Sequence, residues 1–486
     1  MDQLPNIDNL LVTADNPPRA DLLGTGMDHA RCAALHNYLV QYAWLAEGRI
    51  LADLHGNGDN VNTYFTTRGA AAEAIRPRLH PSLAAFLDAA ILPPADDPEP
   101  APIFFWANDF SSPNNLFADF EEDLFDEPAD SLLCLYNPNI GQGGESGGGL
   151  FYHQGCHRAA VFMHMDDHDY ALPVEAHQEL WHPLETVLSN WIELIRLGKI
   201  TASPSDEEPR FVGEKIGPWE WWPYSEAQVD ACVCAWDRLC DAIEARLSSP
   251  PPTSATEPEP LLAPQALDAA SIPEPSFSRS FLSRARRPHF RFIAPGLLLP
   301  PTDTSKFTAL QPFTNLPHDP NLIPPICLFP SERNDLQADL TGTKSPFPHT
   351  FRATSTDSPV PSHVRAGVYS ESIDRRVLDT AEEGFRLLLP YGLQGGTWGT
   401  GSGARKSDGS FVEPGSATQL FQHGYKPFGG DYYRPQRLER LFDHWRKMVE
   451  EGVWAVGPLG VEGGIETFRE ADAEERGRGY VVAPTW

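Results

Sequence analysis

The chain has 486 residues, 41% of them hydrophobic, and a formal net charge of −30. A chain of this length exceeds one ordinary hydrophobic core, so it predicts two or three domains. The large negative charge argues against a general nucleic-acid binder, because phosphate contacts require clustered Lys and Arg, and it disfavours binding to acidic membrane surfaces.

Signals for export and membrane insertion are missing from the sequence. The first residues have neither the basic nor the apolar region of a signal peptide. No apolar run reaches the roughly 18 residues that a membrane-spanning helix needs. We therefore expect a soluble, intracellular and cytoplasmic protein that does not contact a membrane.

The seven cysteines are odd in number and scattered in spacing, which does not suggest a disulfide framework. Three of them, Cys232, Cys234 and Cys240, fall on one helix-like segment. We expect all three to be buried and to serve as small apolar side chains.

The N-terminal part carries helices with clear start signals. Asp28 is placed to cap a helix whose apolar residues recur at helical spacing as far as Gly48. Pro81 opens a second, shorter helix that ends before the next proline pair. Buried strands are predicted by composition at residues 103–106 and 131–136.

Residues 141–199 are the least random stretch of the chain. Six of the 16 histidines lie between His153 and His182. The glycines within 141–149 indicate a loop, and residues 159–163 predict a buried strand. If that strand continues, His164, Asp166 and His168 point to one face, because side chains alternate along a strand.

These last three residues are the candidate site. Two imidazoles and one carboxylate are ligands suited to Zn, Fe or Mn, and they could also act as a metal-free acid and base. The structural alternative is that His164 and His168 are turn or surface residues. A thiol–imidazole pair between Cys156 and its neighbours His153 and His157 is a weaker hypothesis, because sequence neighbours on a strand seldom face one another.

The next segments are two helices separated by a tryptophan-rich turn. The first helix begins at Pro183 and ends at Gly198. The turn at 218–223 is predicted to be either a loop in the core or a platform for cations and flat rings. Ser225 and Gln228 then form a capping box for a long helix.

A change of composition after this helix predicts a domain boundary. Eight prolines between Pro250 and Pro275 indicate a flexible or extended linker. We predict an N-terminal α+β lobe at 1–248, a Pro-rich linker at 249–280 and a C-terminal α+β lobe at 281–486.

A single basic segment follows, with five arginines from Arg279 to Arg291. Three interpretations fit it: docking onto the protein's own acidic surface, binding of a phosphate- or acid-bearing partner, and a nuclear-import signal. The last would place the protein in the nucleus.

The C-terminal part is predicted to contain an amphipathic helix over 374–389 and another from Pro435 to Gly452. Between them lies a second glycine-rich loop at 395–406. The loop lacks the spacing of a Walker motif, so phosphate binding is a secondary interpretation.

The sequence therefore predicts an α+β protein of two lobes with mixed or antiparallel sheets. The leading hypothesis is an enzyme that acts on a small molecule in a cleft between the two glycine-rich loops, with His164, Asp166 and His168 as its acid–base or metal site. The alternative is a non-enzymatic protein whose acidic and Trp-rich surfaces bind a basic or proline-rich protein partner. Neither the substrate, the reaction nor the oligomeric state follows from the sequence.

Overall fold

A computed structural model gives the fold of most of the chain. It describes residues 4–54, 61–94, 97, 100–117, 128, 130–139, 148–163, 174, 178–211, 213, 215–248, 259–315, 319–341, 345–347, 361–396, 401–430 and 434–486. Helices and mainly antiparallel sheets make up this part, which confirms the predicted α+β class. None of the helices described there is both long and apolar enough to cross a membrane.

The chain divides into two compact units. One comprises Met1–Trp222, Tyr425–Tyr432 and Pro484–Trp486, and the other Pro223–Gly424 and Tyr433–Ala483. The predicted lobes at 1–248 and 281–486 and the linker at 249–280 stay a prediction, because residues 249–258 lie outside the described part.

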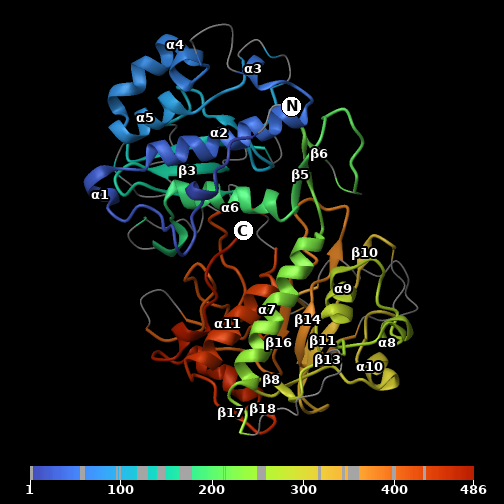
Figure 1. The fold of residues 1–486 in the computed structure, drawn as a ribbon. Helices are drawn as coiled ribbons and strands as arrows, with labels where there is room; N and C mark the ends of the chain where they lie inside the picture. The colour runs from blue at the N-terminus through green and yellow to red at the C-terminus, as the bar shows by residue number, and fades with distance from the viewer. Residues whose placement is uncertain are drawn as a thin grey trace. The chain divides into compact units, whose positions relative to one another are not determined.

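The first unit contains short and long helices around two small sheets (Figure 1). In chain order its elements are η1 (Asp8–Leu10), α1 (Leu22–Thr25), α2 (His29–Ala46), α3 (Leu51–Leu54), α4 (Tyr64–Ile75), η2 (Arg76–Arg78), α5 (Pro81–Ala89), β1 (Ala107–Phe110), β2 (Leu132–Pro138), β3 (Gly149–His153), β4 (Arg158–Phe162), η5 (Gln178–Leu180), α6 (Leu184–Arg196), β5 (Ile200–Ala202), β6 (Lys215–Ile216) and β7 (Trp219–Trp221).

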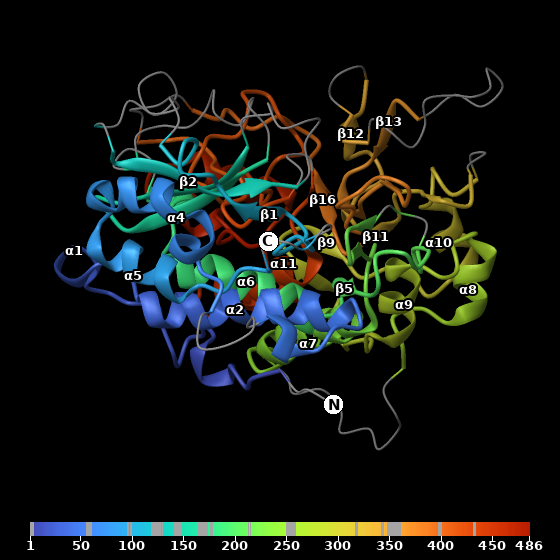
Figure 2. The same cartoon turned by 90° about the horizontal axis from the view of Figure 1, so that it is seen from above.

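The larger sheet of this unit is antiparallel and has the strand order β1-β2-β3-β4. Helices α2 and α6 lie on one side of it, and α2 also packs against α5 (Figure 2). The predicted start signals are confirmed: Asp28 accepts the Arg31 N–H at 3.2 Å, and Pro81 opens α5. Strand β1 begins at Ala107, directly after the predicted strand at 103–106, whose residues are buried in a turn.

The tryptophan-rich turn belongs to the core. Strand β7 is buried along its whole length and is the middle strand of the sheet β5-β7-β6. Ten of the twelve tryptophans of the chain are buried, Trp222 is partly exposed and Trp398 lies outside the described residues. The described part therefore offers no open tryptophan surface of the kind that the interaction-protein alternative requires.

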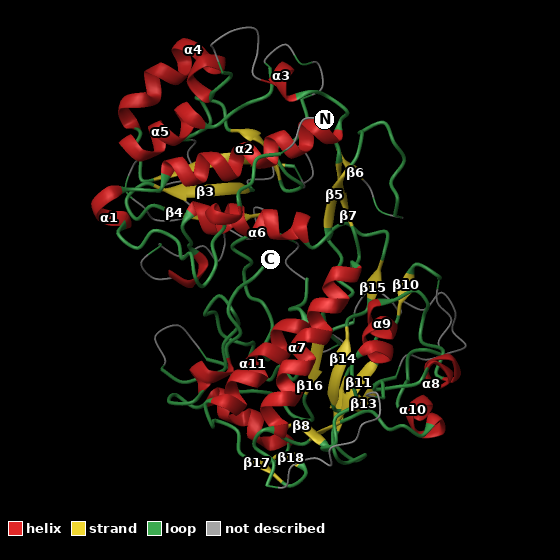
Figure 3. Ribbon diagram, viewed as in Figure 1, coloured by secondary structure: helices red, strands yellow, loops and turns green. Residues whose placement is uncertain are grey.

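The second unit places two long helices beside a three-stranded sheet (Figure 3). In chain order its elements are α7 (Glu226–Glu244), α8 (Pro264–Ala269), α9 (Phe277–Arg284), β8 (Phe292–Ala294), β9 (Leu297–Leu298), α10 (Thr304–Ala309), β10 (Leu322–Ile323), β11 (Cys327–Pro330), β12 (Gln337–Asp339), β13 (His363–Arg365), β14 (Gly367–Ser370), β15 (Ile373–Asp374), β16 (Phe385–Leu388), α11 (Leu438–Glu450), β17 (Val456–Gly457), β18 (Gly460–Val461), η7 (Ile465–Asp472) and η8 (Gly477–Tyr480).

Aromatic side chains join these helices to the sheet β11-β14-β16. Helices α7 and α11 pack against each other. Trp236 of α7 stacks on Phe329 of β11 with ring centroids 5.3 Å apart, and it contacts Phe442 of α11 edge-on at the same distance. The predicted capping box is also confirmed, since Ser225 and Gln228 each accept the other's backbone N–H.

The helix predicted over 374–389 is wrong. This segment contains β15, a turn and β16, which pairs with β14 along all four of its residues. Asp379 has a φ of 62°, a left-handed value that an α-helix does not contain, and its carboxylate pairs with Arg434 at 2.7 Å. Sheet pairing and a buried long-range ion pair thus override the local apolar spacing.

The cysteine prediction on α7 is right for two residues and wrong for the third. Cys232 and Cys240 are buried, whereas Cys234 is exposed. Positions two apart on a helix face different directions, so only one face of α7 reaches the core.

The basic segment docks onto acidic side chains of its own unit, as the first of its three interpretations predicted. Arg284 pairs with Glu226 and Asp230 at the start of α7. The other pairs are those of Arg279 with Asp268 and Glu274, and of Arg286 with Asp237, Asp241 and Glu244. These pairs account for three of the five arginines.

Candidate functional site

The predicted metal ligands His164, Asp166 and His168 lie outside the described residues, so the metal and acid–base hypotheses for them stay predictions. Among the residues that the structure describes, no group of three or more His, Cys, Asp or Glu side chains is arranged to hold a metal ion. The predicted cleft between the two glycine-rich loops also stays a prediction, because most of the first loop lies outside the described ranges.

The described part of the histidine cluster is a tight turn between β3 and β4. We call residues 153–158 (His-Gln-Gly-Cys-His-Arg) the histidine turn. His153 pairs with Arg158 at the end of the β3–β4 ladder that the turn closes, and the residues between them reverse the chain. This reversal folds Cys156 back toward His153, which a continuous strand would not do.

Backbone amides fix the orientation and tautomer of His153. Its Nδ1 accepts the N–H groups of Gly155 and Cys156, both at 3.1 Å. In the neutral ring the proton therefore lies on Nε2, which is a hydrogen-bond donor. A Cβ on Gly155 would lie 2.9 Å from Cε1 of His153, so a larger residue at this position would have to displace the ring.

His157 is buried in a left-handed backbone conformation with a φ of 56°. Such a conformation costs a residue other than glycine about 1–3 kcal/mol and is concentrated at functional sites. Burial, followed by the nearby His80 and His153, lowers the pKa of His157 to about 4. At neutral pH its ring is therefore uncharged, and its Nδ1 shares a hydrogen bond of 2.9 Å with the Tyr152 hydroxyl.

A third histidine comes from a distant part of the chain. The ring of His80, the N-cap of α5, packs edge-on against His157 with centroids 4.4 Å apart. Its Nδ1 accepts the Ser82 N–H at 3.2 Å and lies 2.9 Å from the Ser82 hydroxyl. Gln154 ties this helix start to the histidine turn, since its Oε1 accepts the His80 N–H at 2.6 Å.

Two adjoining cavities of the first unit border this cluster and share Ser131 and Gly155. The larger has a volume of about 630 Å³ and the smaller about 310 Å³, with His80 in the wall of the smaller. The polar residues that line the larger are Asp21, Ser131, His153, Cys156 and Arg158, and its apolar wall includes Leu22, Leu23 and Val174. This size and this mixture of walls suit a small organic molecule.

The hydrogen bonds at Nδ1 of His153 and His80 differ from those that metal-binding histidines usually make. Histidines that bind metals generally donate their second ring N–H to an oxygen acceptor. His153 and His80 instead accept backbone N–H groups at Nδ1. In the neutral tautomer of each ring the proton therefore lies on Nε2, and an imidazole N–H is a group that can polarise a carbonyl.

The thiols of the chain differ sharply in accessibility. Burial raises the pKa of Cys134 to about 11 and that of Cys327 to about 12. The pKa values of the buried Cys32, Cys232 and Cys240 are raised well above 9, also chiefly by burial. Cys156 and Cys234 are the two that are not buried, and Cys156 lines the larger cavity together with polar side chains.

The second glycine-rich loop surrounds an internal anion. The Asp472 carboxylate accepts backbone N–H groups from Gln394, Gly395 and Ala404 at 2.9–3.2 Å. These amides are the donors that a phosphate would need, and the protein's own carboxylate occupies them. In its described residues the loop therefore binds Asp472, and phosphate binding stays a prediction for residues 397–400, which lie outside the described part.

Comparisons of the chain with models of protein families, with characterised proteins and with solved structures found no significant match. The site is therefore defined by its own geometry. His80 and Gln154 could not be predicted from local patterns, because none of these indicates which residues contact each other over more than 70 positions of the chain. The capping position of His80 before Pro81 was the one signal available.

Proposed function

We propose that the protein is an enzyme that transfers or hydrolyses the acyl group of a small ester or thioester in the larger cavity. The observation that carries the proposal is that the His153 ring, held at Nδ1 by two backbone N–H groups, and the partly exposed Cys156 line the same cavity. A donor and a nucleophile in one cavity are the two groups that acyl transfer requires.

The reaction would proceed in two steps. The sulfur of Cys156 attacks the carbonyl carbon, and the oxygen that gains negative charge accepts a hydrogen bond from Nε2 of His153. The bond to the leaving alcohol or thiol breaks, and the leaving group departs with the thiol proton. Water then hydrolyses the acyl–cysteine to a free carboxylic acid and restores the thiol.

Arg158 supports a preference for substrates with an anionic group. It lines the same cavity, and one of its N–H groups is held by the Trp181 carbonyl at 2.8 Å, which orients the guanidinium. A fixed guanidinium binds a carboxylate or phosphate in a defined geometry. We therefore expect a monoester of a dicarboxylic acid to react faster than a neutral ester of the same length.

The test uses p-nitrophenyl hemisuccinate and p-nitrophenyl butyrate with the full-length protein. Intact-mass and peptide analysis should show an acyl group on Cys156, and p-nitrophenol should be released over many turnovers. The matched control is Cys234→Ser, which removes the other accessible thiol and should leave turnover unchanged. Cys156→Ser should abolish it.

His153→Gln separates catalysis from binding. Loss of a donor to the developing oxyanion should lower kcat by roughly 10²–10³-fold with little change in KM. Equal acylation of Cys156 and Cys234, or turnover that survives in Cys156→Ser, would contradict the proposal.

A further inference from the structure

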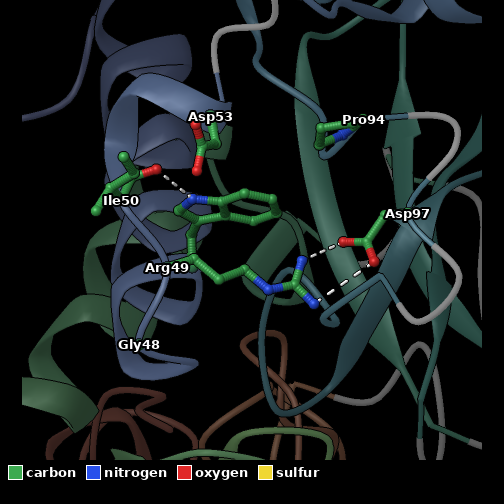
Figure 4. Close-up of a pocket in the computed structure, with 7 residues that line it drawn as sticks. Gly48, Arg49, Ile50, Asp53, Pro94 and Asp97 are labelled. Atoms are coloured by element: carbon green, nitrogen blue, oxygen red, sulfur yellow. Dashed lines mark hydrogen bonds and ion pairs between the residues drawn. The ribbon is translucent and has the colours of Figure 1, made fainter.

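A third cavity of the first unit lies at the C-terminal end of α2, away from the histidine turn in sequence. Its volume is about 500 Å³, and its walls are formed by Trp44, Gly48, Arg49, Ile50, Asp53, Pro94 and Asp97. Figure 4 shows that the Arg49 side chain extends across this space toward Asp97. The volume is sufficient for a ligand of the size of an amino acid.

The walls already hold one guanidinium group, that of Arg49. Its central carbon lies 4.5 Å from the centroid of the Trp44 ring. Its two terminal nitrogens reach the two carboxylate oxygens of Asp97, one of them at 3.5 Å. A planar cation that stacks on an indole and binds a carboxylate through two nitrogens is the geometry that guanidinium favours over ammonium.

The side chains of Trp44 and Asp97 are buried, whereas that of Arg49 is more exposed. Trp44 is 5% exposed, and its ring N–H donates to the Ile50 carbonyl at 2.8 Å. The side chain of Asp97 is 6% exposed, but that of Arg49 is 30% exposed. Of these three side chains, Arg49 is therefore the one that reaches solvent, while the indole is held by its own hydrogen bond.

The charge of the site also favours a cation. Asp53 and Asp97 contribute two negative charges against the single positive charge of Arg49. The C-terminal end of the 18-residue helix α2 adds the negative end of its dipole. An incoming guanidinium that replaced Arg49 would meet the same surplus of negative charge.

We infer that this cavity is a binding site for a small molecule that bears a guanidinium group, and that Arg49 is a built-in competitor for it. The ligand's guanidinium takes the place of the Arg49 group between Trp44 and Asp97, and Arg49 moves to solvent. This inference is independent of the acyl-transfer proposal, because it uses none of the residues of the histidine turn.

The experiment measures binding of N-acetyl-argininamide to the full-length protein by isothermal titration calorimetry. Arg49→Ala removes the competitor and should bind the probe at least tenfold more tightly than the wild type. The double variant Arg49→Ala/Asp97→Asn should lose this binding. N-acetyl-lysinamide should bind Arg49→Ala at least tenfold more weakly than the arginine compound.

The matched control is Arg333→Ala, which removes an exposed arginine that pairs with Asp335 in the second unit. It should bind the probe as the wild type does. If Arg49→Ala does not fold, Arg49→Met, which retains an apolar stem over Trp44, takes its place. Binding to either Arg49 variant that is no tighter than to Arg333→Ala would overturn the inference and leave the Arg49–Asp97 pair a structural contact only.

Discussion

Acidification should destabilise the first unit through His36, a histidine in the middle of its core. His36 has no exposed surface, and both ring nitrogens have partners. Nε2 lies 2.9 Å from the Ile91 carbonyl, which can only accept, so Nε2 carries the proton. Nδ1 lies 2.9 Å from the Tyr136 hydroxyl and accepts from it. Protonation of Nδ1 would place a positive charge in the core and would force the Tyr136 hydroxyl to change from donor to acceptor.

The magnitude follows from the pKa of His36, which burial lowers from 6.5 to about 4. Above pH 6.5 the ring is neutral in both the folded and the unfolded chain. Between pH 6.5 and 4 the unfolded chain binds a proton that the folded protein does not, so the free energy of unfolding falls as the pH falls. At about 1.4 kcal/mol per pH unit, the full loss over this window is roughly 3 kcal/mol.

The assay is urea unfolding followed by circular dichroism at several pH values between 7.5 and 4. His36→Gln keeps an amide donor and acceptor but cannot titrate, so its free energy of unfolding should depend less on pH than that of the wild type. The exposed His363→Gln in the second unit is the control and should retain the wild-type slope. An unchanged slope in His36→Gln would refute the reasoning. The pH dependence of the free energy of unfolding that remains in His36→Gln arises in part from three other histidines. These are His157, His182 and His444, whose pKa values are also lowered to about 4, chiefly by burial.

Two further predictions concern the glycine-rich loop and the thiols. Asp472→Ala leaves the N–H groups of Gln394, Gly395 and Ala404 without their acceptor and should lower the free energy of unfolding by about 2–3 kcal/mol, measured by urea denaturation. Asp472→Asn, which keeps one acceptor oxygen, should lose less, and an equal loss would contradict the role of the carboxylate oxygens. Iodoacetamide at pH 7.5 should alkylate Cys156 and Cys234 in the folded protein and the other five cysteines only after denaturation, as judged by peptide mass spectrometry. Rapid labelling of a buried cysteine such as Cys134 in the folded protein would show that the core opens.

The sequence alone was sufficient where local signals act within one or two turns of chain. Helices α2, α5, α6, α7 and α11 begin and end close to the predicted residues, because caps, prolines and apolar spacing operate over three to seven positions. The capping box of Ser225 and Gln228 is such a signal. Docking of the basic segment onto acidic side chains, the first of its three interpretations, is confirmed for Arg279, Arg284 and Arg286, since an acidic chain offers its arginines many internal partners.

Local signals failed where distant contacts decide the conformation. Apolar spacing over 374–389 resembles a helix, yet pairing of β16 with β14 makes the segment part of a sheet. The composition of the glycine-rich loop at 395–406 suggests that its backbone N–H groups bind an anion. In the described residues they bind the Asp472 carboxylate, which comes from a segment that no pattern in the loop identifies.

The features of the candidate site also fall into two groups, those that the sequence determines and those that depend on the fold. The sequence by itself determined that histidines concentrate after residue 150. It also determined that a buried strand follows His153, and this strand is β4. Only the tertiary structure decided that His153 and Cys156 share a cavity, that His80 packs on His157 and that Nδ1 of His153 is an acceptor. The physical reason is that side-chain type is encoded residue by residue, whereas tautomer, burial and pKa are set by neighbours that the folded chain brings together from distant positions.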